Sequence, residues 1–309
     1  MNKQVELKSR MPETYIFKSV GDCEIKADVY GGSPGDVPRP VVLMFHGGAL
    51  IIGGREWVDE DLCGRLMDSG FVVVSADYRL APETKLSDII EDVNDAYRWV
   101  REQGQELFGA DPNRIGVQGF SAGGYLTLMT GFCVEPRPKA LVSISGYGDI
   151  ICDWYTKPDP FYCTRPRVSD EDARSAVGEG VPCGNPQGKR RGDFYLYCRQ
   201  NGLWPKEVTG FDPETEGAAS RRFCPVLNVT ADYPPTFLYH GDNDTDVPYS
   251  QSVQMAGALA AASVPHEFVP LQGGGHGINS STPEGQRVIE RAVEFLVHYV
   301  KAGIGSRGE

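Results

Sequence analysis

Two kinds of hydrophobic pattern alternate along this chain. Residues 14–20 and 23–30 alternate apolar and polar side chains, which is typical of antiparallel strands with one solvated face. We expect these two runs to form a hairpin. Continuous apolar runs at 40–46 and 71–78 indicate strands buried on both faces of a parallel sheet, and further strands are expected at 114–120, 140–146, 236–242 and 266–272.

Runs with helical period separate these strands. Within 87–104, one face carries Ile89, Val93 and Val100, and Ser87 is placed to cap the start of that helix. Further helices are expected at 56–69, 121–132, 249–262 and 283–301. This alternation predicts the α/β class: a mostly parallel central sheet with helices on both faces.

The regular alternation stops between residues 147 and 225, where Pro, Gly, Cys, Trp and Tyr follow in irregular order. A stretch of this length is too long for a plain connection and is typical of a lid or binding element. We therefore expect one core formed by residues 1–146 and 226–309, with residues 147–225 inserted as a cap. Its aromatic side chains either line an apolar pocket or form a small core of their own.

Composition narrows the choice of partners. The 309-residue chain is 40% hydrophobic and has a formal net charge of −12, which would repel a nucleic-acid backbone or an anionic membrane. We therefore expect no nucleic-acid partner. The one dense basic run, Lys189–Arg191, is interpreted as a solvated loop.

Targeting signals and metal motifs are missing from the sequence. The N-terminal residues lack the apolar segment of a secretory signal, and no segment is apolar enough over the length that spans a bilayer. The expectation is a cytoplasmic protein. The 8 cysteines form no C-x-x-C pair and no zinc-type spacing, so no metal is expected. Five of them lie between 152 and 224, and the sequence leaves open whether these five form disulfides.

One serine stands between glycines in Gly119-Phe120-Ser121-Ala122-Gly123, after an apolar strand and before a predicted helix. That context suits a sharp strand-to-helix turn that exposes a nucleophilic serine oxygen. It also suits a serine that caps the helix N-terminus. The motif alone leaves both interpretations open.

A nucleophilic serine needs a histidine as base. His276 lies in the glycine-rich segment QGGGHGI after the last predicted strand, where a loop could bring its imidazole over the strand ends. It is the candidate base. His240, His266 and His298 are interpreted as packing or surface residues.

The base in turn needs an acid that orients it. Asp242, Asp244 and Asp246 lie in HGDNDTDVP at the end of the strand that contains His240. Spacing within this segment does not choose among the three carboxylates.

A further element is FHGGALIIGG, residues 45–54, at the end of a buried strand. Consecutive glycines allow backbone N–H groups to turn toward a bound carbonyl oxygen. Together with the amide of Ala122, they would form an oxyanion hole.

With these motifs in this order, and with ADYRLAPE at 76–83, the chain resembles the α/β-hydrolase fold family. Within it, the chain resembles the esterase and lipase branch, both hormone-sensitive-lipase-like and feruloyl-esterase-like carboxylesterases. The resemblance runs from about residue 40 to the C-terminus, apart from 147–225. It departs from many relatives at Ala49, where they have a third glycine, and at Phe120, where hormone-sensitive-lipase relatives have Asp.

The resemblance implies roles for individual residues. Ser121 would be the nucleophile and His276 the general base. The Gly-x-x-Asp spacing of relatives selects Asp244, with Asp246 as second choice. The resemblance also implies the oxyanion donors, which would be Gly47, Gly48 and Ala122.

These roles predict a serine hydrolase that cleaves a small-molecule carboxylic ester through an acyl-enzyme, without cofactor or metal. An amidase or peptidase, or a natural-product tailoring enzyme that opens a lactone or a carbon–carbon bond, would use the same triad. A non-catalytic ligand-binding protein on a hydrolase scaffold is the third alternative, because fold does not fix function. The sequence does not predict an oligomeric state.

Overall fold

The computed structural model describes residues 11–35, 37–178, 180–184 and 190–302. The predictions for the first ten residues and for Lys189 therefore fall outside the described residues. The central feature is a sheet of eight strands in the order β1-β2-β4-β3-β5-β6-β7-β8. The strands are β1 (Glu13–Val20), β2 (Cys23–Tyr30), β3 (Arg39–Phe45), β4 (Val72–Ala76), β5 (Ala110–Phe120), β6 (Ala140–Ile144), β7 (Thr236–Gly241) and β8 (His266–Leu271).

The two sequence patterns correspond to two parts of this sheet. The alternating runs form the antiparallel hairpin β1–β2, which joins the rest through antiparallel β2–β4 pairing. The continuous apolar runs form the parallel part, in which β3 pairs with both β4 and β5. The mostly parallel α/β class predicted from the sequence is confirmed.

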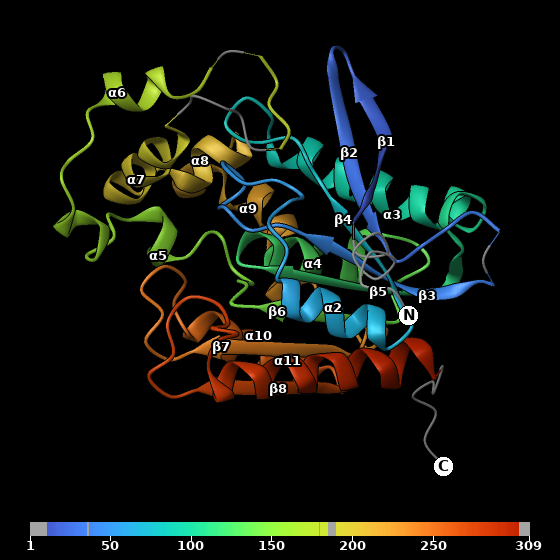
Figure 1. The fold of residues 1–309 in the computed structure, drawn as a ribbon. Helices are drawn as coiled ribbons and strands as arrows, with labels where there is room; N and C mark the ends of the chain where they lie inside the picture. The colour runs from blue at the N-terminus through green and yellow to red at the C-terminus, as the bar shows by residue number, and fades with distance from the viewer. Residues whose placement is uncertain (1–10, 36, 179, 185–189, 303–309) are drawn as a thin grey trace.

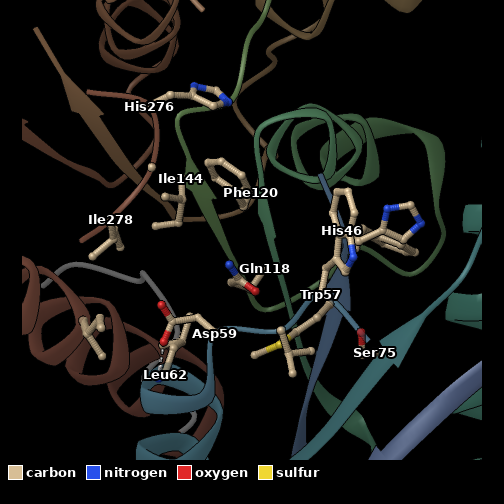
Figure 2. Close-up of a pocket in the computed structure, with 15 residues that line it drawn as sticks. His46, Trp57, Asp59, Leu62, Ser75, Gln118, Phe120, Ile144, His276 and Ile278 are labelled. Carbon is tan, nitrogen blue, oxygen red and sulfur yellow. Dashed lines mark hydrogen bonds between the residues drawn. The ribbon is translucent and has the colours of Figure 1, made fainter. Parts of the chain in front are cut away.

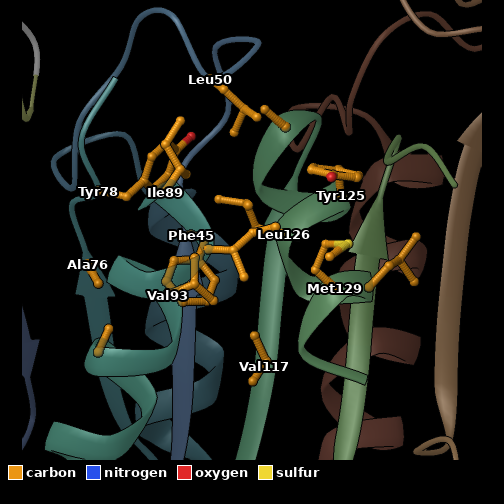
Figure 3. Close-up of a cluster of buried hydrophobic side chains, with 14 of the residues drawn as sticks. Phe45, Leu50, Ala76, Tyr78, Ile89, Val93, Val117, Tyr125, Leu126 and Met129 are labelled. Atoms are coloured by element: carbon orange, nitrogen blue, oxygen red, sulfur yellow. The ribbon is translucent and has the colours of Figure 1, made fainter. Parts of the chain in front are cut away.

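Among the described residues, five helices outside 147–225 pack on the two faces of the sheet (Figure 1). The buried side chains of α3 and α4 form one core with β3, β4 and β5 (Figure 3), and those of α2 and α11 form the other. The helices are α2 (Glu60–Asp68), α3 (Leu86–Phe108), α4 (Ala122–Cys133), α10 (Ser250–Ala261) and α11 (Pro283–Leu296), the last continuing into a π-helical turn at Val297–Lys301.

Two helix starts differ from the sequence prediction. Helix α2 begins at Glu60, four residues later than expected, because the Asp59 side chain accepts a hydrogen bond from the amide of Leu62. Helix α3 begins before Ser87; Lys85 occupies its N-cap position and no side chain caps it. The capping role of Ser87 is therefore wrong.

The segment 147–225 contributes short helices that gather beyond one end of the sheet (Figure 1). Its aromatic rings pack on one another: Trp154 stacks on Tyr155 at 3.5 Å between ring centroids, and Tyr155 stacks on Trp204 at 4.1 Å. Tyr155 and Trp204 belong to the same hydrophobic core as the side chains of α3 and α4, so the expectation of a separate small core is wrong for these two rings. The five cysteines of this segment are thiols, not disulfides. Its helices are α5 (Asp153–Thr156), α6 (Asp170–Ser175), α7 (Arg191–Asn201), α8 (Trp204–Thr209) and α9 (Pro213–Ser220).

Candidate active site

Ser121 lies at the sharp turn between β5 and α4. Its backbone has φ 54° and ψ −119°, a conformation that a residue with a Cβ adopts only under strain, and its side chain makes no capping hydrogen bond. A Cβ at Gly119 would lie 2.1 Å from the carbonyl oxygen of Gly123, and one at Gly123 would lie 1.9 Å from that of Phe45. The flanking glycines are therefore required by close backbone contacts, and the turn holds the serine at the end of the strand.

Asp244 lies in the loop after β7 with its side chain fully buried. One carboxylate oxygen, Oδ1, accepts hydrogen bonds from the amides of Asp246 (2.8 Å) and Val247 (3.0 Å). The other, Oδ2, lies 2.7 Å from Nδ1 of His276 and 3.1 Å from Nε2 of His240. Burial alone would raise the pKa of Asp244, but the hydrogen bonds from the two histidines and from Val247 outweigh it and hold the pKa well below its usual range.

The contact between His240 and Asp244 is one that sequence reasoning missed. The His240 ring is fully buried; its Nδ1 lies 2.7 Å from Oγ of Ser252 and its Nε2 lies 3.0 Å from the carbonyl oxygen of Val247. Since Nε2 of His240 faces only acceptors, we assign the ring proton to Nε2. Nδ1 of His240 then accepts a hydrogen bond from the hydroxyl of Ser252. His240 is thus a packing residue, as interpreted, but one that also helps to fix Asp244. The i, i+4 spacing after a buried strand was its only signal.

The other ring nitrogen of His276 faces a second carboxylate. Nε2 lies 3.4 Å from Oδ2 of Asp246, and the ring contacts that of Phe120 at 4.8 Å between centroids. Burial would lower the pKa of His276, but the hydrogen bond to Asp244 and the charges of Asp246 and Asp244 raise it. Among the described residues, no hydrogen bond joins His276 to the Ser121 hydroxyl; catalytic hydrogen bonds often form fully only with substrate bound.

Asp246 also bonds to the inserted segment. Its Oδ1 accepts hydrogen bonds from the hydroxyls of Tyr162 (2.7 Å) and Tyr195 (2.5 Å), and from Nη1 of Arg199 (3.0 Å). Arg199 is 1% exposed and also pairs with Asp159. Asp246 therefore joins residues of 147–225 to the histidine, whereas Asp244 contacts only the core.

The loop after β3 brings Gly47 and Gly48 near the serine turn, with Gly48 at φ 105°. In the described part of the chain, the amides of Gly47, Gly48 and Ala122 donate to no carbonyl or side-chain oxygen. Three free amides at this place fit the predicted oxyanion hole.

Residues of the ADYRLAPE motif support this loop. The Tyr78 hydroxyl donates to the carbonyl oxygen of His46 at 2.9 Å, and the amide of Ala81 donates to that of Leu50 at 2.8 Å. Ala49, at φ 56°, presents its carbonyl oxygen to the indole N–H of Trp204 at 2.9 Å. The departure from a third glycine therefore coincides with a contact to the inserted segment.

Arg191 corrects the interpretation of the basic run as a solvated loop. Its side chain is 3% exposed and forms a two-pronged ion pair with Glu83, each contact 2.8 Å. Its Nε also donates to the carbonyl oxygen of Ile51 at 2.6 Å, and Nη2 donates to that of Ala81. Burial would raise the pKa of Glu83, but the hydrogen bonds from Arg191 and Gly178 lower it. Sequence composition cannot distinguish this arginine from its exposed neighbour Arg190.

We expect Arg191→Met to lower the free energy of unfolding by about 3–5 kcal/mol, because it leaves the buried Glu83 carboxylate without its partner. Arg190→Met is the matched control: that side chain is 85% exposed, so a change within about 0.5 kcal/mol is expected. Urea denaturation of the three proteins measures both values. Equal effects of the two substitutions would contradict the anchoring role of Arg191.

Among the described residues, no group of three or more His, Cys, Asp or Glu side chains is arranged to hold a metal ion. Within the same residues, no helix combines the length and the apolar character needed to cross a membrane.

Two family models match different parts of the chain. The model described as "alpha/beta hydrolase fold" matches residues 42–166, and that of the prolyl oligopeptidase family matches residues 195–303. Each match covers less than half of the chain. Together with the order of strands in the sheet, the first match shows the α/β-hydrolase fold that the motifs predict.

Solved structures with the same fold include an α/β-hydrolase superfamily protein from Enterococcus faecalis, with a TM-score of 0.72 and 20% identity over 94% of this chain and 99% of that one. Esterase Est2 from Thermogutta terrifontis has a TM-score of 0.65 and 23% identity over 96% of this chain and 95% of that one.

Curated relatives are much longer proteins. The non-reducing polyketide synthase Preu3 from Preussia isomera is 28% identical over 94% of this chain, which spans 13% of that synthase. Preu6 from the same organism is 29% identical over 85% of this chain, again matching 13% of its own length.

Proposed function

We propose that this protein is a serine hydrolase that cleaves a carboxylic ester through an acyl-enzyme, with Ser121 as nucleophile, His276 as general base and Asp244 as orienting acid. The observation that carries the proposal is the pairing of His276 Nδ1 with the fully buried Asp244 carboxylate at 2.7 Å, from the strand ends beside a strained serine turn. A serine that only capped the helix would need neither the His276–Asp244 pair nor a strained backbone.

The mechanism follows from these positions. His276 Nε2 takes the proton of the Ser121 hydroxyl as its oxygen attacks the ester carbonyl carbon, and the amides of Gly47, Gly48 and Ala122 stabilise the resulting oxyanion. The imidazolium then protonates the departing alcohol. Water, deprotonated by the same histidine, attacks the acyl-enzyme and releases the acid. Asp244 keeps the Nδ1 proton in place throughout and stabilises the imidazolium charge.

We further propose that residues 147–225 act as a cap whose position is linked to His276 through Asp246. With Tyr162, Tyr195 and Arg199 bonded to Asp246, Nε2 of the histidine faces a carboxylate instead of the nucleophile. Substrate binding would have to turn Nε2 toward Ser121. This would make substrates that engage the segment more reactive than simple esters of the same acyl group.

A second candidate is cleavage of a natural-product lactone, one of the tailoring reactions expected from the sequence, or of an acyl thioester, which is not one of them. It is favoured by the similarity to non-reducing polyketide synthases along 94% of this chain. The same nucleophile, base and oxyanion donors serve both carbonyl substrates, so the two functions differ in the leaving group and in what the cap admits.

The test compares 4-nitrophenyl esters with thioesters and 4-nitroanilides of the same acyl groups, over about pH 5 to 9. We expect hydrolysis of esters, with kcat/KM rising through the ionisation of His276 at a pH above about 6.5, the ordinary pKa of histidine, because both carboxylates raise it. A thioester rate well above the ester rate would favour the second candidate. Absence of hydrolysis, together with no labelling of the folded protein by a fluorophosphonate, would overturn both in favour of a binding protein.

A further inference from the structure

A cavity of about 190 Å³ lies between the sheet and helices α2 and α11, and Phe120 and His276 line one side of it (Figure 2). Its walls are mainly apolar and come from β3, β6, α2 and α11 and from the loop after His276: Met44, Leu62, Ile144, Ile278 and Ile289. An apolar protein cavity of about 150 Å³ is large enough to bind benzene. This cavity therefore has room for one aromatic ring with a small substituent.

Gln118 is one of five polar residues that line this cavity, with His46, Asp59, Ser75 and His276. The residue lies on β5, is 7% exposed, and its side-chain amide forms no hydrogen bond with any described residue. Figure 2 shows the amide in the middle of the lining residues. The atoms of this amide stay accessible from the cavity, so a ligand hydroxyl could both donate to its oxygen and accept from its nitrogen.

Charge in the lining limits the class of ligand. Asp59 is part of the wall; within the described residues its carboxylate accepts a hydrogen bond only at Oδ1, from the amide of Leu62 in the cap of α2. A bound carboxylate or phosphate would meet this charge in a mostly apolar space, which disfavours anions. Trp57, 48% exposed, lines the cavity at the surface and offers an indole ring to an aromatic ligand.

The cavity is distinct from the position of the nucleophile. Ser121 is not among its lining residues, whereas the ring of Phe120 and the ring of His276 form part of one wall. These two rings are in contact with each other. A molecule in the cavity would therefore touch the back of the candidate site without occupying the place of the ester carbonyl.

We propose that this cavity is a binding site for a neutral, hydroxyl-bearing molecule with a single apolar ring, of the phenol class, held by the Gln118 amide. The proposal does not depend on hydrolysis, because none of the contacts it uses involves the serine.

The test measures dissociation constants by NMR titration of the Ser121→Ala protein, so that turnover cannot interfere. Phenol, toluene, benzoate and benzylammonium have similar size and differ in hydrogen bonding and charge. We expect phenol to bind about tenfold more tightly than toluene, the effect of one net hydrogen bond, and benzoate to bind more weakly than both. Trp57 fluorescence should change with the same dissociation constant for phenol.

Gln118→Leu is the matched variant, because it keeps the approximate volume and removes the amide. We expect it to abolish the preference for phenol over toluene while toluene still binds; retained toluene binding also shows that the variant is folded. Three results with the protein that retains Gln118 would overturn the proposal. Phenol and toluene could bind equally tightly, benzylammonium or benzoate could bind more tightly than phenol, or none of the four could bind. An unchanged preference in Gln118→Leu would do the same.

Discussion

Ser121→Ala is expected to lower kcat for ester hydrolysis by a factor on the order of 10⁵ or more, the loss measured when the nucleophile of a triad is removed. The same variant should no longer be labelled by a fluorophosphonate. The physical reason is that Ser121 occupies the strained turn at the end of β5, where its oxygen can reach a substrate carbonyl and where no capping bond occupies it. Steady-state rates and intact-protein mass spectrometry measure the two effects.

Two further variants separate chemistry from folding. Ser87→Ala changes an exposed serine of α3 that caps nothing and should leave hydrolysis and labelling unaltered. Ser121→Gly should also be inactive, but it relieves the strain of a positive φ and should be more stable than the Ser121 protein by about 1 kcal/mol. Residual labelling of Ser121→Ala at the native rate would place the nucleophile elsewhere.

Asp244→Asn is expected to lower kcat/KM by about 10³–10⁴-fold with little change in substrate binding. The Asp244 Oδ2 atom faces nitrogen atoms of two histidines, and its Oδ1 accepts two backbone amides. An asparagine in this place must turn an N–H group toward one of these donors, so it favours the wrong tautomer or orientation of His276. The burst of acyl-enzyme formation should slow by the same factor.

Asp246→Asn tests the second carboxylate on the same ring. Removing its charge takes away one of the causes that raise the pKa of His276, so the rise of kcat/KM with pH should move to lower pH. Hydrogen bonds from Tyr162 and Tyr195 can still reach the asparagine oxygen, so the loss of activity at high pH should be far smaller than in Asp244→Asn. If Asp246→Asn lost more activity than Asp244→Asn, then Asp246 rather than Asp244 would be the acid that orients His276.

The sheet and the positions of Ser121 and His276 in the candidate site could be predicted because local patterns encode them. Runs of buried side chains define β3, β4, β6 and β7, since a strand buried on both faces has little room for polar side chains, whereas the edge strand β8 is mostly half-buried or exposed. Ser121 and His276 stand in glycine-rich segments at strand ends, where backbones approach too closely for a Cβ. Such steric demands act over a few residues and can be recognised in a single sequence.

The choice between Asp244 and Asp246 required three dimensions. Both aspartates lie two residues apart in one loop, and the Gly-x-x-Asp spacing favours Asp244 only by resemblance. In the structure, Asp244 is the carboxylate with a fully buried side chain and four hydrogen-bonding contacts, whereas Asp246 turns toward the inserted segment. Burial and partner geometry decide which group stays ionised beside Nδ1.

The sequence by itself determined the α/β class, the order of strands and helices, and the residue types that meet at the strand ends, because periodicity and steric exclusion are short-range. Only the tertiary structure decided which polar side chains became buried: Arg191 on Glu83, His240 on Asp244, and Gln118 in a cavity. The burial of Arg191 depends on a partner 108 residues away. The burial of His240, although it lies four residues from Asp244, and of Gln118 depends on the exclusion of water by packed elements, which a local sequence pattern does not encode.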